Sequence, residues 1–383
     1  MTAADPFATD ERRALRDLTA DFTRGEIAPH LAQWELDGEL PRSLHRRAAD
    51  AGLLGLGIDE SLGGSGGDLV DVVVMTEAII DNGGSGGLIA GLFTHGIALP
   101  PLVAAAPSGL WDRVGRPVLA GEAITALAVT EPGGGSDVAA LRTRAVRDGD
   151  AYVLDGAKTY ITSGSRADHV VVAARTGGPG AAGLSLLVVD ADTPGFTVSR
   201  RLDKMGWHCS DTAELAFTGC RVPAANLVGS EGQGFELLAR QFVTERISLA
   251  VTAYATAQRC LDLTLAWCRE RETFGKPLIA RQVVRHALVE MRRLTDVSRT
   301  YARSVAVRHV NGEQVPAEAA MAKETAVQAC DTVVDRAVQL FGGMGYMRES
   351  EVERHYRDAR VLGIGGGATE VMTDLAARLL GYT

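Results

Sequence analysis

Hydrophobic and polar positions along this chain follow three patterns in succession. Up to about residue 120, apolar side chains recur at helical spacing, as at Leu15, Leu18 and Phe22. From about residue 122 to residue 229, the apolar positions form short runs separated by turn residues, which is typical of strands without intervening helices. Helical spacing then returns, and residues 235–272 contain neither proline nor glycine, which predicts one long helix packed in a bundle.

These patterns predict an α+β protein of several domains. We expect an N-terminal α-helical domain over residues 1–120, a compact middle β-domain over 121–231 and a C-terminal helical domain over 232–383. Two glycine clusters, at 63–67 and 83–87, are interpreted as flexible loops within the first domain.

Composition and charge restrict the classes of function. The 383 residues carry a formal net charge of −9, so no basic surface favours nucleic acid or a membrane as partner. The N-terminus lacks the basic and apolar stretches of an export signal, which favours a cytoplasmic protein. The five cysteines form no CxxC pair, so we expect buried thiols and no metal site.

Three glycine motifs imitate sites of other enzymes. Both glycine clusters match the G-x-S-x-G pattern of hydrolases, but neither follows a strand of an α/β sheet. Residues 363–368 match G-x-G-x-x-A after a short candidate strand at 360–362. The chain ends sixteen residues after Gly367, which leaves no room for the rest of a dinucleotide-binding unit.

The segment from Ala128 to Asp137 is the most informative part of the sequence. A strand there runs into Gly133, Gly134, Gly135 and Ser136. Glycines allow backbone N–H groups to approach an anion closely, and the serine adds a hydroxyl donor. The segment can therefore hold a pyrophosphate, although a flexible β-turn explains it equally well when it is considered alone.

Four blocks in order give the chain its resemblance to the acyl-CoA dehydrogenase family. The first is the segment just described, and the second is Asp155 to Gly164, similar to the strand that lies against the flavin in that family. The third and fourth blocks are Arg271 to Pro277 with Gln282, and Gln339 to Tyr346 continuing through Tyr356 to Arg360. The resemblance implies a helical N-terminal domain, a β-barrel-like middle domain and a C-terminal four-helix bundle, with FAD between the last two.

The resemblance also assigns roles to individual residues. It implies that Tyr160 packs beside the flavin ring, that Thr162 bonds flavin N5, and that nearby residues contact the cofactor and its pyrophosphate, namely Val129, Thr130, Gly135 and Ser136. A further set would reach the FAD of a neighbouring subunit or support that contact, namely Arg271, Phe274, Gln282, Gln339 and Gly343. Such sharing implies at least a dimer, and commonly a homotetramer built as a dimer of dimers.

The position of the catalytic base departs from the commoner family pattern. Many members carry a glutamate where this chain has Gly366, and Ala368 replaces the usual threonine. Long-chain and isovaleryl-type members carry the glutamate on the first long helix of the bundle, and the matching residue here is Glu245, followed by Arg246. We expect Glu245 to be the base, Arg246, Gly366 and Ser136 to contact substrate, and Glu370 to bind the cofactor.

These residues lead to a functional hypothesis. The resemblance implies an FAD-dependent dehydrogenase that converts an acyl-CoA thioester to the trans-2-enoyl-CoA and passes electrons to an electron-transfer flavoprotein. Two alternatives remain at this point: a dehydrogenase or oxygenase acting on acyl groups bound to a carrier protein, and a catalytically silent paralogue. No residue dictates the length or branching of the acyl chain.

Overall fold

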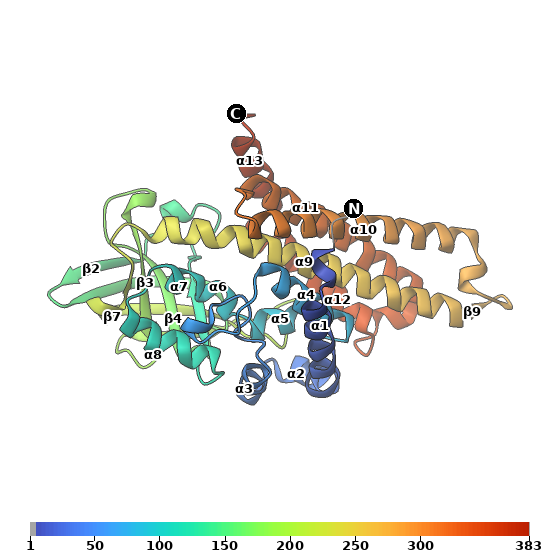
Figure 1. Ribbon diagram of the computed structural model, residues 1–383, viewed down its shortest axis with the longest axis horizontal. Coiled ribbons are helices and arrows are strands. Elements are labelled where there is room, and N and C mark those ends of the chain that lie inside the picture. The colour runs from blue at the N-terminus through green and yellow to red at the C-terminus, as the bar shows by residue number, and fades with distance from the viewer. Residues whose placement is uncertain (1–4, 383) are drawn as a thin grey trace.

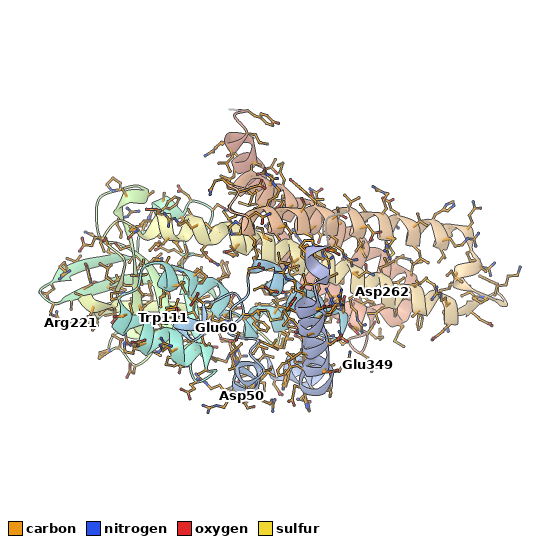
Figure 2. The ribbon with its side chains drawn as sticks, viewed as in Figure 1. Asp50, Glu60, Trp111, Arg221, Asp262 and Glu349 are labelled. Carbon is orange, nitrogen blue, oxygen red and sulfur yellow. The ribbon has the colours of Figure 1, made fainter. Side chains whose placement is uncertain are left out.

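The computed structural model describes residues 5–382, which form an elongated molecule (Figure 1). A β-sheet occupies one end, one long helix extends from it to the other end beside two further long helices, and the N-terminal helices pack along one side. Figure 2 marks the sheet end with Arg221 and the long helices with Asp262. The element order is helical, β, helical, which confirms the predicted fold class.

The N-terminal helices are built around α4, which is buried on most sides. Asp68 begins α4 with a reciprocal cap, since its carboxylate accepts bonds from two backbone N–H groups while the Asp71 carboxylate accepts from the Asp68 N–H. Arg12 bonds both carboxylates and so fixes α1 against α4. The helices are α1 (Asp10–Phe22), α2 (Leu31–Asp37), α3 (Arg42–Asp50), α4 (Leu69–Asp81), α5 (Gly86–Leu92), α6 (His95–Ala98), α7 (Pro100–Ala105) and α8 (Ser108–Leu119).

An eight-stranded mixed sheet follows. Its order is β6-β7-β3-β2-β4-β5-β8, and β1 pairs in parallel with β4. Both faces of β4 and β5 are covered, one by α8 around Trp111 and the other by the apolar face of β3 and β7, which explains their continuous apolar runs. The strands are β1 (Thr125–Ala128), β2 (Arg144–Asp148), β3 (Ala151–Thr162), β4 (His169–Arg175), β5 (Leu184–Asp190), β6 (Phe196–Arg201), β7 (Thr212–Pro223) and β8 (Leu227–Val228).

The C-terminal part consists of long helices, the first of which, α9, begins at the sheet. Gly234 starts α9 against β5, where a Cβ atom would lie 2.7 Å from the carbonyl carbon of Ser185. The 37 residues of α9 extend for about 55 Å at 1.5 Å per residue and lead to a hairpin at the far end of the molecule (Figure 1). The elements are α9 (Gly234–Glu270), β9 (Glu272–Thr273), β10 (Lys276–Pro277), α10 (Gln282–Val310), α11 (Pro316–Phe341), α12 (Glu351–Ala359) and α13 (Thr369–Leu379).

Glu77 ties the N-terminal helices to these long helices. Its buried carboxylate accepts hydrogen bonds from Arg16 at 2.6 Å, from Arg303 at 2.8 and 2.6 Å, and from the Tyr254 hydroxyl at 2.7 Å. Burial would raise the pKa of Glu77, but these bonds and the charge of Arg303 outweigh it, so the pKa is lowered. The carboxylate is therefore ionised and connects α1, α4, α9 and α10.

Two local predictions are wrong. The cluster at 83–87 is not a flexible loop, because Ser85 accepts a bond from the Leu88 N–H at 3.1 Å and caps α5, whose buried first residues are Gly86 and Gly87. The candidate strand at 360–362 is instead a 3-10 helix, Arg360–Gly363, which continues directly from α12.

Among the residues that the structure describes, no single helix has the length and apolar composition of a membrane span. Only the bent pair of α5 with the helical segment His95–Ala105 reaches that composition jointly.

Candidate active site

The predicted anion cradle is an open turn attached to the sheet. Glu131 and Gly134 exchange backbone hydrogen bonds of 3.2 and 3.0 Å, and the Thr130 carbonyl accepts from the Thr159 N–H at 2.9 Å. A Cβ atom added at Gly133 or Gly134 would meet no heavy atom within 4 Å. The backbone of this turn is thus exposed and accessible to a ligand.

Glu131 holds the cradle in place. Its carboxylate accepts from the N–H groups of Arg142 and Thr143, each at 2.7 Å, and from the buried Lys158 ammonium at 3.0 Å. Burial would raise the pKa of Glu131, but these hydrogen bonds and the charge of Lys158 lower it to about 2. Lys158 also donates to the Val129 carbonyl at 2.9 Å, so β1 and β3 are joined below the turn.

Tyr160 stands beside the cradle in a strained conformation. The register between β3 and β7 shifts between Lys158 and Ile161, and within this irregularity Tyr160 has a φ of 60°. The ring is 70% exposed, although the residue lies within a strand. An exposed aromatic ring held in the left-handed region next to an anion cradle suits stacking with a planar ligand. Thr162, at the end of the same strand, is half-buried.

Glu245 lies on the side of α9 that faces α5 and α6. One turn before it, Gln241 donates to the Gly96 carbonyl at 3.1 Å, and two turns after it Thr252 approaches the Gly86 position. The Glu245 side chain is half-buried rather than on a solvated face. Burial raises its pKa against the opposing charges of Arg246 and Lys323.

The structure brings the two candidate positions of the base together. A Cβ atom added at Gly366 would lie 3.6 Å from Glu245 Oε1. The same atom would lie only 2.3 Å from Leu249 Cδ1, and the φ of Gly366 is +63°. Leu249 and Glu245 therefore occupy the space that a side chain at position 366 would need.

Arg246 follows Glu245 in the chain and keeps a free donor. Its guanidinium carbon lies 5.6 Å from the centre of the Phe242 ring, and its buried Nε has no hydrogen-bond partner among residues 5–382. Burial lowers the pKa of Arg246 against the charge of Glu245. The guanidinium can donate to a polar group of a ligand in the same region.

A second set of predicted residues gathers at the opposite end of the long helices. Trp267 connects them, because its ring stacks on Phe341 at 4.8 Å, its Nε1 donates to the Leu340 carbonyl at 3.2 Å, and the Arg271 guanidinium lies 6.0 Å from its centre. Phe274 is 98% exposed with a φ of 51°. The remaining predicted residues at this end are also exposed, namely Gln282, Gln339 and Gly343.

The two sets do not meet within one chain. Helix α9, about 55 Å long, begins at the sheet that carries the cradle and ends at the hairpin with Arg271 and Phe274, at the other end of the molecule (Figure 1). Glu370 lies in the first turn of α13 and is exposed. Gly366, four residues earlier in the chain, adjoins Glu245.

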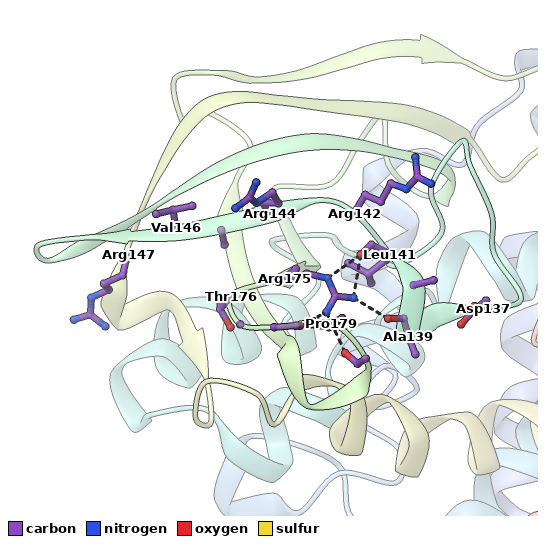
Figure 3. Close-up of a pocket in the computed structure, with 15 residues that line it drawn as sticks. Asp137, Ala139, Leu141, Arg142, Arg144, Val146, Arg147, Arg175, Thr176 and Pro179 are labelled. Atoms are coloured by element: carbon purple, nitrogen blue, oxygen red, sulfur yellow. Dashed lines mark hydrogen bonds between the residues drawn. The ribbon is translucent and has the colours of Figure 1, made fainter.

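Sequence reasoning missed a groove next to the cradle, with a cavity volume of about 910 Å³ (Figure 3). It is lined by residues 137–147 and 175–180. Arg175 connects the two loops that line the groove. It donates hydrogen bonds to the carbonyls of Ala139 and Leu141 on one loop and of Gly178 on the other. Arg142 and Arg144 are exposed along it and alternate with the buried Leu141, Thr143 and Ala145. This alternation, typical of a strand with one buried face, was the signal available in the sequence.

Comparisons with known proteins identify the family of this chain. The family models of the acyl-CoA dehydrogenase N-terminal, middle and C-terminal domains match residues 9–122, 126–220 and 232–381. A solved structure of a probable acyl-CoA dehydrogenase from Mycobacterium abscessus is 61% identical with a TM-score of 0.97, covering 98% of this chain and all of that chain. The mitochondrial long-chain specific acyl-CoA dehydrogenase of Sus scrofa is 36% identical, over 97% of this chain and 86% of the relative.

A further solved chain, from a structure described as the electron transferring flavoprotein of Acidaminococcus fermentans, is 30% identical with a TM-score of 0.93. It covers 99% of this chain and 100% of that chain. The protein described here belongs to the acyl-CoA dehydrogenase family, whose members are flavoprotein oxidoreductases that use FAD.

Proposed function

We propose that this protein catalyses FAD-dependent α,β-dehydrogenation of an acyl-CoA thioester to the trans-2-enoyl-CoA, with Glu245 as the base. The observation that carries the assignment of the base is the 3.6 Å between Glu245 Oε1 and the Cβ position of Gly366. The carboxylate of α9 thus stands where the commoner glutamate of the family would project.

The residues present fit FAD. The open turn at Gly133 and Gly134 offers unobstructed backbone, and Ser136 adds an exposed hydroxyl for a pyrophosphate. Tyr160 and Thr162 would flank the flavin ring, with Val129, Thr130 and Gly135 shaping the turn. Bound FAD supplies the hydride acceptor, so the protein has to supply the base and the alignment.

Glu245 takes the proton from the carbon next to the thioester carbonyl. Its half-buried position raises its pKa, which makes the carboxylate a stronger proton acceptor than one in water. Arg246 and the Gly366 turn border the same space, so we assign both to substrate contact. Glu370, exposed on α13, is assigned to the cofactor because it matches a family position near the adenosine end of FAD.

The groove beside Ser136 suits the phosphate groups of coenzyme A. Its exposed guanidinium groups, on Arg142 and Arg144, provide positive charge within a chain whose net charge is negative. A thioester carried by a protein is the less favoured alternative, because the similar curated proteins are acyl-CoA dehydrogenases.

We also propose that a second copy completes the site. The exposed residues around Arg271 would hold the FAD of a neighbouring subunit, in a homotetramer built as a dimer of dimers. A cytoplasmic location and reoxidation by an electron-transfer flavoprotein belong to the same proposal, and the similarity to the Acidaminococcus fermentans chain supports that partner.

The test is an anaerobic titration of the purified protein with straight, branched and aromatic acyl-CoAs. We expect a yellow protein with one FAD per chain, bleaching of the flavin by at least one thioester, and formation of the 2-enoyl product. The same acyl groups on a carrier protein serve as the comparison. A protein that cannot take up FAD, or rapid release of hydrogen peroxide in air, would contradict the proposal.

A further inference from the structure

Lys323, on α11, is a buried cation that no predicted role uses. Its side chain has no exposed area, and its ammonium donates to the Gly367 carbonyl. Its nearest carboxylate, that of Glu324, lies at 3.6 Å, beyond hydrogen-bond distance. Lysine is almost never fully buried unless it is paired, and the partners of this ammonium are the Gly367 carbonyl and a long ion pair with Glu324.

A single turn of backbone connects Lys323 to Glu245. The ammonium holds Gly367 through its carbonyl, and the preceding residue, Gly366, faces Glu245 Oε1. Both glycines have positive φ, +63° at Gly366 and +105° at Gly367, and a Cβ at Gly367 would lie 2.3 Å from Met372 Cε. Glycine at both positions lets the turn follow this path without strain or displacement of Leu249 and Met372, and Lys323 anchors it.

We infer that Lys323 is a positioning residue for the proposed base, holding the turn at residues 366–367 against Glu245 and stabilising the Glu245 carboxylate by its buried charge. This inference rests on the proposed function, since it concerns the same base.

The charged groups around the pair are few. The charges of Arg246 on α9 and Lys323 on α11 lower the pKa of Glu245. The charges of Glu324 and Glu245 raise the pKa of Lys323, and the charge of Arg246 lowers it. The turn contributes only backbone, and His95 of the facing α6 is directed to the Leu54 carbonyl instead.

The sign of the effect follows from these charges. Burial raises the pKa of Glu245, and the positive charges of Arg246 and Lys323 oppose this rise. Removing Lys323 should raise the pKa further. Because the base works only when ionised, the rate falls as pH drops through that pKa, so the acid limb of the pH profile should move to higher pH.

The experiment compares Lys323→Met with Lys323→Arg in the FAD-loaded protein. Anaerobic flavin reduction by a saturating acyl-CoA is measured in single turnovers across pH. We expect the acid limb of the Lys323→Met profile to move to higher pH by about one unit. The rate should therefore fall roughly tenfold at the acid end of the profile and less at high pH. Lys323→Arg should keep the limb near its original place.

Lys204→Met is the control, because Lys204 is a half-buried lysine that, like the fully buried Lys323, donates to a backbone carbonyl, here that of Ser210, outside the site. It should leave the acid limb unchanged. A uniform loss of rate in Lys323→Met, with no shift of the limb, would overturn the inference and leave Lys323 a purely structural residue.

A second measurement does not depend on activity. Thermal unfolding of Lys323→Met, Glu245→Gln and the double variant forms a double-mutant cycle. We expect the double variant to be more stable than the sum of the single effects predicts, even if Lys323→Met alone folds poorly. Additive effects would overturn the inference. If no acyl-CoA reduces the flavin of the unmodified protein, the proposed function has failed, and the cycle still tests the pairing.

Discussion

Four residues other than glycine have a positive φ among those that the structure describes: Tyr160, Ser163, Trp207 and Phe274. Such conformations are costly and concentrate at functional sites. Two of the four, Tyr160 and Phe274, are cofactor candidates from the family resemblance. The sequence could supply their identity but not their strain, because the strain at Tyr160 depends on how β3 pairs with β7.

Glu131 provides a test at the scale of a residue. Glu131→Gln removes the charge that faces the buried Lys158 ammonium and weakens the link between the cradle and β3. We expect a loss of about 3 kcal/mol in the free energy of unfolding and a lower affinity for FAD. Urea unfolding and flavin content measure the two effects.

Glu122→Gln is the control for this substitution, because Glu122 forms only an exposed pair with Arg46 at 3.6 Å. Unchanged stability and flavin content in Glu131→Gln would show that the cradle does not depend on the ion pair between Glu131 and Lys158.

Among the elements, the long helix was the most predictable. Residues 235–272 were predicted as one helix from the absence of proline and glycine, and α9 covers Gly234–Glu270. The strands β4 and β5 were equally visible as short apolar runs, since both of their faces are buried. These signals are local, so they could be read without knowledge of the fold.

The start of α5 could not be predicted, because its cause is a contact between distant segments. Gly86 and Gly87 lie against Trp207, whose Nε1 and Cα would each be 2.8 Å from a Cβ at one of these positions. Glycine is needed here for close packing rather than for a flexible loop. The groove beside the cradle was missed for a similar reason, because it exists only where Arg175 joins two loops.

For the site as a whole, the resemblance supplied the candidates and the structure supplied their grouping. The contact between Glu245 and the Gly366 position joins segments about 120 residues apart in the chain, so no local pattern reveals it. Lys323 carried no sequence signal, because a lysine on a helix usually lies at the surface.

At the scale of the whole molecule, the separation of the two residue sets is the basis for proposing that a second copy completes the cofactor site. Arg271→Ala removes a cation proposed to reach the FAD of the neighbouring subunit. Arg271 is exposed at the hairpin end of α9, so we expect the fold to tolerate its loss. We expect a roughly tenfold weaker hold on FAD with the fold intact. Flavin content after gel filtration, measured together with molecular mass, tests this.

Arg269→Ala is the matched control, since Arg269 is an exposed arginine in the last turn of the same helix. It should retain FAD. A monomeric form of the native protein that holds FAD as tightly as the oligomer would refute the shared site.

The most direct test of the account is the rate of anaerobic flavin reduction in Glu245→Gln. Glutamine keeps the volume of the side chain but cannot accept the proton, so we predict normal FAD content, normal substrate binding and a rate at least about a hundredfold lower. Glu370→Gln, which alters the exposed carboxylate of α13, should cost far less. Full-rate reduction in Glu245→Gln would contradict the account and require another carboxylate as the base.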